Sequence, residues 1–182
     1  MNQSLLDMHR LVWVSLMAAV VAASSYLVIP IGPIPFSLQP VFVFLAGYLL
    51  GAARGFFVMC LYLAAGIIGL PVFAGGAAGV GHLIGPTGGY LVGFLVSPLL
   101  TGRARAESEN GSVRWISGLF WGIIAIIVTY GLGFVWLKTF ADITWARAFA
   151  VGVVPFAPWD MIKIAVAVGC CRYLQKYNLA PR

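Results

Sequence analysis

Asp160 and Lys163 form a charged pair in an otherwise apolar stretch, VPFAPWDMIKIAVAVG, near the C-terminus. Residues three apart lie on one face of a helix, and Pro155 and Pro158 indicate that this helix begins close by. The ammonium of Lys163 suits an anionic ligand, and the Asp160 carboxylate can accept N–H groups from the same ligand. In the structural alternative, Asp160 merely caps the helix N-terminus and Lys163 merely pairs with it.

Aromatic and amide side chains elsewhere are candidates for the rest of a pocket. Gln39 can donate and accept hydrogen bonds to a ligand or, alternatively, bond a free loop carbonyl. His82 is expected to hydrogen-bond within its loop rather than relay protons, because no second titratable group is near it in sequence. A cavity with aromatic walls and one cation suits a small amphipathic acid. The residues that can form such walls, or instead pack or face lipid, are Phe36, Phe73, Tyr90, Phe156 and Trp159, and Gly75 completes the candidate set.

The composition is that of a membrane protein. Of the 182 residues, 62% are hydrophobic and 9% are charged, which leaves too little polar surface to cover a soluble globule. A charged residue at the centre of a membrane costs about 2.5–3.5 kcal/mol, so Asp160 and Lys163 are functional candidates by default. The net charge of +6 comes from scattered Lys and Arg, which argues against a nucleic-acid partner. Cys60, Cys170 and Cys171 have neither metal-binding nor disulfide spacing.

The apolar runs predict an all-α integral membrane protein with six transmembrane helices in a single domain, residues 1–182. The first run has no small-x-small cleavage site after it and is expected to be retained as a helix. The second and fourth runs are short, and short helices in a membrane suggest an internal site. The predicted helices are Leu11–Ile29, Val41–Ala52, Gly55–Leu70, Gly88–Leu100, Val113–Leu137 and Pro155–Tyr173.

The connections between these helices differ in composition. Pro30–Pro35 has three prolines in six residues and is expected to be an extended loop. Gly69–Gly89 is rich in glycine yet apolar, which predicts a re-entrant loop folded back against the protein. Thr101–Arg114 is hydrophilic and is predicted to be a solvated loop.

The distribution of Lys and Arg predicts the orientation in the membrane. With both termini in the cytoplasm, eight basic residues face the cytoplasm and two face outward, in line with the positive-inside rule. Both unusual loops then lie on the outer face, as does Lys138–Ala150, which can lie along the membrane surface with Trp145 and Phe149 as anchors. The cytoplasmic set is Arg10, Arg54, Arg103, Arg105, Arg114, Arg172, Lys176 and Arg182, and the outer set is Lys138 and Arg147.

Small residues recur at intervals of four in the first helix. Ala18 and Ala22, and likewise Ala19 and Ala23, form pairs that let another helix approach closely. They serve either packing within the protein's own bundle or docking onto a separate membrane subunit.

Three segments, IPFSLQP, GIIGLPVFAGGAAGVGHLIGPTGGYLVGF and PFAPWDMIK, follow one another over about 130 residues. Together they resemble the BioY family, the biotin-binding S components of energy-coupling factor (ECF) transporters. The resemblance implies a six-helix subunit of the bacterial inner membrane that captures biotin externally. It also implies that Asp160 and Lys163 are the family's polar pair, and that Tyr90 and Gln39 line the pocket. A glycine commonly precedes that aspartate in the family, whereas Trp159 stands here, so the pocket mouth is expected to differ.

The same resemblance implies partner proteins. These are a transmembrane scaffold subunit, docked through the alanine motif of the first helix, and two ATP-binding cassette subunits. The chain has no Gly-x-x-x-x-Gly-Lys-[Ser/Thr] motif, so ATP hydrolysis is assigned to the partners, and neither a cofactor nor an enzymatic activity is expected. Biotin also suits the residues themselves, because its carboxylate needs a cation, its ureido N–H groups need acceptors and its ring and alkyl chain need apolar walls.

Three other functions remain as alternatives. A stand-alone, proton-coupled transporter of a small organic acid would use Asp160 or His82 as its proton carrier. An intramembrane enzyme is disfavoured, because the common catalytic motifs are missing from the sequence. A structural membrane protein would bind no ligand saturably, and self-association is left open.

Overall fold

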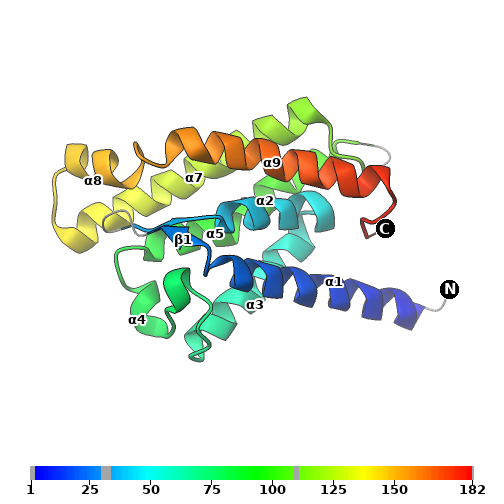
Figure 1. The fold of residues 1–182 in the computed structure, drawn as a ribbon, viewed down its shortest axis with the longest axis horizontal. Helices are drawn as coiled ribbons and strands as arrows, with labels where there is room; N and C mark the ends of the chain where they lie inside the picture. The colour runs from blue at the N-terminus through cyan, green and yellow to red at the C-terminus, as the bar shows by residue number, and fades with distance from the viewer. Residues whose placement is uncertain (1–2, 30–33, 109–110, 182) are drawn as a thin grey trace.

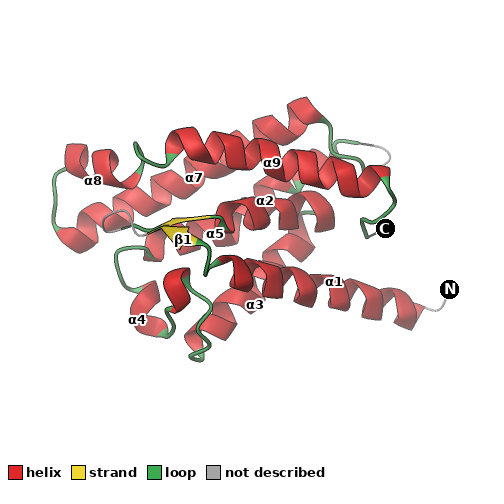
Figure 2. Ribbon diagram, in the orientation of Figure 1, coloured by secondary structure: helices red, strands yellow, loops and turns green. Residues whose placement is uncertain are grey.

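The protein is mostly helical, and a long helix overlaps each of the six predicted apolar runs (Figures 1 and 2). The structure, a computed structural model, describes residues 3–29, 34–108 and 111–181. Within the described ranges, α2 and α5 are the shortest of the six long helices, with 12 and 14 residues. The six are α1 (Gln3–Ser24), α2 (Gln39–Leu50), α3 (Ala52–Ile67), α5 (Gly88–Thr101), α7 (Trp115–Ala141) and α9 (Ala157–Lys176).

Most of the shorter elements gather at the end of the molecule opposite the two termini (Figure 1). The 3-10 turn η1 (Ala74–Gly76) and helix α4 (Val80–Leu83) lie between α3 and α5, and α8 (Trp145–Gly152) lies between α7 and α9. Strands β1 (Val28–Ile29) and β2 (Phe36–Ser37) pair antiparallel in a short hairpin. This end of the bundle therefore carries most of the irregular backbone that can shape a site.

The prediction that the first helix continues to Ile29 is wrong. Helix α1 ends at Ser24, and residues 28 and 29 belong to β1. Ile29 precedes Pro30 in the sequence, and the residue before a proline is driven out of the helical region towards an extended conformation. Residues 30–33 of the predicted proline loop lie outside the described residues, so their extended form stays a prediction.

The prediction of a solvated loop over Thr101–Arg114 is wrong in part, because a short helix, α6 (Arg103–Ala106), lies within it. The Arg105 guanidinium donates to the Leu49 carbonyl at the end of α2, and to the Pro181 carbonyl at 3.1 Å. Carbonyls at a helix end have no partner within the helix, so Arg105 supplies one that is missing. These bonds hold the segment against the bundle.

Helix α2 forms the centre of the bundle. Eleven of its twelve residues are buried, and it packs against α1, α3, α5 and α9. A helix that is apolar all round is stable in this position, because every face meets another helix. Gln39, the first residue of α2, is thereby held inside the protein beside its neighbours on the other helices.

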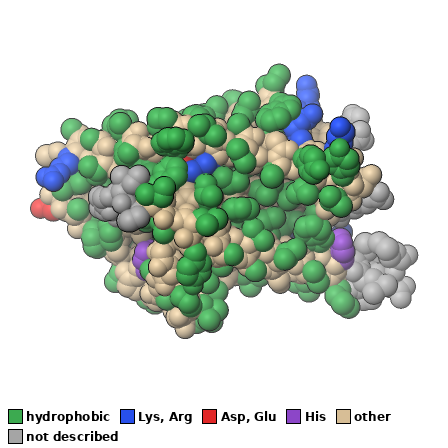
Figure 3. All heavy atoms as spheres, in the orientation of Figure 1, with side chains coloured by type: hydrophobic (Ala, Val, Ile, Leu, Met, Phe, Trp, Pro, Cys, Tyr) green, Lys and Arg blue, Asp and Glu red, His purple; other side chains and the backbone are tan. Residues whose placement is uncertain are grey.

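The surface is also largely apolar (Figure 3). Exposed large side chains include Ile116, Ile127 and Ile162, which are 80%, 61% and 55% exposed. In the described part of the chain, α7 alone is long and apolar enough to cross a membrane by itself, and α8 with α9, bent by 45°, meets the same criterion as a pair. An apolar exterior of this extent is typical of a protein surrounded by lipid or by partner subunits.

Candidate functional site

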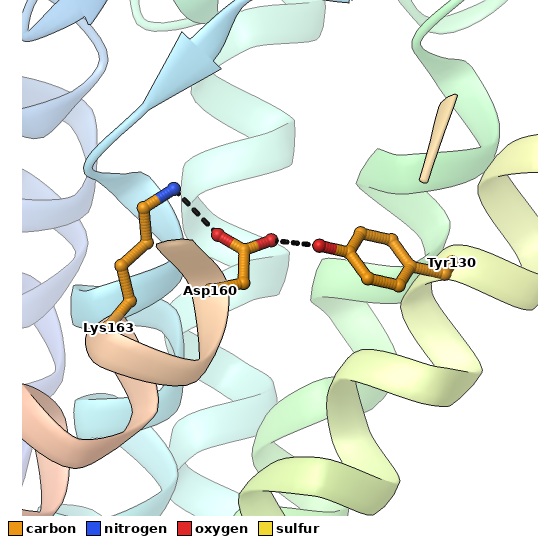
Figure 4. Close-up of polar contacts among 3 residues, drawn as sticks. All are labelled: Tyr130, Asp160 and Lys163. Carbon is orange, nitrogen blue, oxygen red and sulfur yellow. Dashed lines mark hydrogen bonds and ion pairs between the residues drawn. The ribbon is translucent and has the colours of Figure 1, made fainter. Parts of the chain in front are cut away.

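The charged pair predicted from the sequence forms, and a third residue completes it (Figure 4). Lys163 Nζ lies 2.7 Å from Asp160 Oδ1, and the Tyr130 hydroxyl on α7 donates to Asp160 Oδ2. Asp160 and Lys163 are 4% and 5% exposed. Pro158 lies in the first turn of α9, which places Asp160 at the positive end of the helix dipole. Both charges are thus removed from bulk water and compensated locally.

Phe36, from the hairpin, covers the lysine. Lys163 Nζ lies 3.9 Å from the centre of the Phe36 ring, close enough for a cation–π interaction. The same ring stacks on Phe156 and meets Trp159 edge to face, with ring centres 6.4 and 6.1 Å apart. Trp159 is exposed and packs against Phe36, outside the cavity described next.

A cavity of about 70 Å³ lies next to the pair, with room for several water molecules. Five of the sequence-predicted residues line it: Lys163, Asp160, Tyr90, Gln39 and Phe156. Its walls come from the hairpin, η1, α4 and the helices α2, α5, α7 and α9. The remaining lining residues are Ile34, Pro35, Ser37, Pro40, Ala74, His82, Thr87, Leu91, Phe94, Ile126, Thr129 and Tyr130.

Tyr90 and Gln39 are held by hydrogen bonds to other parts of the bundle. The Tyr90 hydroxyl donates to the Gly152 carbonyl at 2.8 Å, and a Cβ atom at Gly133 would lie 2.3 Å from the Tyr90 ring. The Tyr90 ring can therefore pack this closely against α7 only because residue 133 is glycine. Gln39 Nε2 donates to the Tyr62 hydroxyl at 2.9 Å, so the alternative of a bond to a loop carbonyl is wrong for this nitrogen.

Four sequence-predicted residues do not line the cavity, as far as the described residues define it: Phe36, Phe73, Gly75 and Trp159. Phe36 covers Lys163 from outside. Phe73 is fully buried and stacks on His82 at 5.1 Å between ring centres. Gly75 has φ = +71°, a backbone conformation that favours glycine, and its N–H donates to the Ser25 carbonyl at 2.9 Å. Phe73 and Gly75 therefore support the cavity wall without lining the cavity.

His82 is confirmed as a residue that hydrogen-bonds within its own segment. Its Nε2 lies 3.3 Å from the Thr87 hydroxyl. Burial lowers the pKa of His82 below its usual value, because a protonated imidazole would lose hydration there.

Sequence reasoning missed Tyr130 and Thr129. Both lie on α7 and line the cavity, and Thr129 hydrogen-bonds to Ser97 on α5, with the two hydroxyl oxygens 2.9 Å apart. Two adjacent hydroxyl-bearing residues inside a predicted membrane helix were the available signal. No cluster of three or more His, Cys, Asp or Glu side chains suited to a metal ion occurs among the described residues.

The two alanine pairs of α1 differ in exposure. Ala18 and Ala22 are half-buried and pack against the core, whereas Ala19 and Ala23 are exposed. The second pair shares its face of α1 with the exposed Val12 and Leu16. Of the two predicted roles, internal packing therefore suits the first pair, and the second pair is available to another protein.

A family model described as BioY family matches residues 1–179. The chain belongs to the BioY family. A probable biotin transporter BioY of Pyrococcus horikoshii is 37% identical over 89% of this chain and 93% of the relative. The biotin transporter BioY of Thermotoga maritima is also 37% identical, over 94% of this chain and 99% of the relative.

The fold also matches that of a solved structure. A crystal structure of the S-component for biotin from an ECF-type ABC transporter superposes with a TM-score of 0.88 and 29% sequence identity, covering 100% of both chains. The BioY membership and this fold make the chain a membrane protein, in agreement with its apolar surface.

Proposed function

We propose that the chain captures biotin from outside the cell as the substrate-specific subunit of an ECF-type ABC transporter. The observation that carries the proposal is the buried Lys163–Asp160 pair, which faces a cavity with mainly apolar walls. Biotin is the substrate named for the relatives and for the similar solved structure. In this proposal the chain is a non-catalytic subunit without a cofactor, and ATP hydrolysis takes place in the partner subunits.

Lys163 binds the carboxylate of biotin in this proposal. An ammonium has three N–H donors, so Lys163 can keep its contact with Asp160 while it donates to the ligand. Asp160, 2.7 Å from this ammonium, holds it towards the ligand, and the Tyr130 hydroxyl donates to the Asp160 carboxylate and orients it. Gln39 and Tyr90 contribute polar contacts, whereas Phe36, Phe73 and Gly75 form the cover and the supporting wall.

A biotin molecule needs more room than the present cavity of about 70 Å³ offers. The hairpin is the element that can move, because only two residue pairs hold its described strands together and its Phe36 side chain lies over Lys163. We expect the hairpin to move outward when biotin enters and to return over it.

Charge and geometry support the membrane topology that we propose. We assign six transmembrane helices, α1, α2, α3, α5, α7 and α9, as a single domain over residues 1–182, with the re-entrant loop and the site towards the outside. Both termini lie at one end of the molecule, opposite the hairpin, α4 and α8 (Figure 1). Placing the termini in the cytoplasm of a bacterial inner membrane puts the majority of Lys and Arg inside.

We assign Ala19 and Ala23 to docking onto the transmembrane scaffold subunit, which in turn carries two ATP-binding cassette subunits. The exposure of this pair supports the choice, since small residues let helices approach closely. Ala18 and Ala22 then stabilise the docking helix from the inside.

The test is equilibrium binding of labelled biotin to the purified chain, with Lys163→Ala and Asp160→Asn beside it. Saturable binding that both variants weaken supports the proposal. A parent protein that binds no biotin refutes the function, and unchanged binding by both variants refutes the site. Uptake that collapses with a protonophore but persists without ATP would instead favour the stand-alone proton-coupled transporter.

A further inference from the structure

A groove between α1 and α3 combines apolar walls with two guanidinium groups. It has a volume of about 470 Å³. Leu11 and Phe57 in its wall are 66% and 60% exposed, so the groove is open along the side of the bundle. Its lining residues are Arg10, Leu11, Val14, Arg54, Phe57 and Leu61.

Arg54 supplies positive charge at the arginine end of this groove. Arg54 has no acidic partner in the part of the chain that the structure describes, and it is repelled by Arg10 and by Arg105. It lies in the first turn of α3, where the helix dipole adds further positive potential. An anion placed between Arg10 and Arg54 would relieve this repulsion.

We propose that the groove binds one anionic phospholipid of the cytoplasmic leaflet, with its phosphate between Arg10 and Arg54 and an acyl chain along Leu11, Phe57 and Leu61. Basic pockets between helices at the cytoplasmic side of a membrane are suited to anionic headgroups. The apolar part of the groove takes the hydrocarbon chain, since that side of the bundle faces lipid. The inference needs the membrane placement and orientation, but it is independent of the biotin assignment.

The groove lies on a different face of α1 from the exposed alanine pair. At 3.6 residues per turn, Ala19 is rotated by about 140° from Val14, and Ala23 by about 180°. A scaffold subunit docked on Ala19 and Ala23 would therefore leave the groove open. The bound phospholipid is thus compatible with the assembled transporter.

Native mass spectrometry of the chain, released from bilayers with equal amounts of phosphatidylglycerol and phosphatidylcholine of the same acyl chains, tests the proposal. We expect phosphatidylglycerol to be retained preferentially. Arg54→Gln and Arg10→Gln should each lower the retained phosphatidylglycerol about fivefold, the usual contribution of one basic residue near an anionic headgroup. Lys176→Gln, at the same end of the bundle, is the matched control and should retain as much as the parent.

Leu61→Trp tests the apolar part of the groove without a change of charge. The larger side chain should displace the acyl chain and lower retention as well, while thermal unfolding shows that the variant is folded. Equal retention of the two phospholipids, or equal losses in Arg54→Gln and Lys176→Gln, would overturn the proposal. Selective retention in a chain that fails to bind biotin would refute the proposed function and leave this inference standing.

Discussion

The cavity and the α1–α3 groove differ in how positive charge is compensated. Lys163, 5% exposed in the cavity, contacts Asp160 at 2.7 Å and the Phe36 ring at 3.9 Å. Arg54, in the groove, has no acidic partner among the residues described. The protein therefore supplies a counter-charge, Asp160, to the buried cation Lys163. It leaves the surface cation Arg54 to pair with groups in its surroundings.

This difference follows from access to water and headgroups. A buried ammonium without a partner loses its hydration and gains nothing in return, so it is retained only with a nearby acid. A guanidinium at the membrane surface keeps contact with water and phosphate groups. Lys163 can therefore interact only with Asp160, its buried neighbours and a ligand in the cavity, whereas Arg54 can interact with lipid headgroups.

The largest expected effect comes from leaving Lys163 buried without its acid. Asp160→Asn should destabilise the protein by about 3–5 kcal/mol, the typical cost of breaking a buried ion pair. The measurement is thermal or denaturant-induced unfolding in detergent. Asp160→Asn combined with Lys163→Met removes both charges and should recover most of the stability but none of the biotin binding. If Asp160→Asn is as stable as the parent, the interior tolerates an unpaired Lys163. Lys163 and Arg54 would then not differ in their need for an acidic partner.

Removing Lys163 itself should also weaken ligand binding. Lys163→Ala should weaken biotin binding on the order of a hundredfold, because truncating one partner of a buried charge pair costs about 2–5 kcal/mol. Equilibrium binding of labelled biotin measures this. Lys138→Ala, near the outer end of α7, and Arg54→Gln serve as controls and should bind like the parent. Comparable weakening in Arg54→Gln would show that the two basic regions are coupled.

The Tyr130 hydroxyl should matter less than either charge. Tyr130→Phe removes the donor to Asp160 and should weaken biotin binding about tenfold, within the range for a hydrogen bond to a charged group. Tyr173→Phe, an exposed tyrosine on α9, is the matched control. An unchanged affinity would mean that Asp160 is held well enough by Lys163 alone.

Local contacts were predictable from the sequence, and contacts between distant segments were not. Asp160 and Lys163 meet because helix geometry brings residues three apart to one face. Tyr130 is 30 positions from Asp160, and their bond depends on how α7 crosses α9. The exposure of Ala19 rather than Ala18 likewise depends on which face of α1 meets the core, and α1 is apolar on several faces.

The smallest expected effect concerns His82, which tests whether a charge near the cavity needs an acidic partner. His82 lines the cavity and has no acidic partner among the described residues. Burial lowers its folded pKa below the unfolded value of about 6.5. Protons then bind more strongly to the unfolded chain, so stability should be constant above about pH 6.5 and fall as the pH decreases below it. Unfolding temperatures at pH 7.5 and 5.5 measure the loss, and His82→Gln should reduce it while the exposed His9→Gln should not. If the parent and His82→Gln lose the same unfolding temperature between pH 7.5 and 5.5, protonation of His82 does not destabilise the folded protein. A cation beside the cavity would then not need an acidic partner, contrary to what we infer for Lys163.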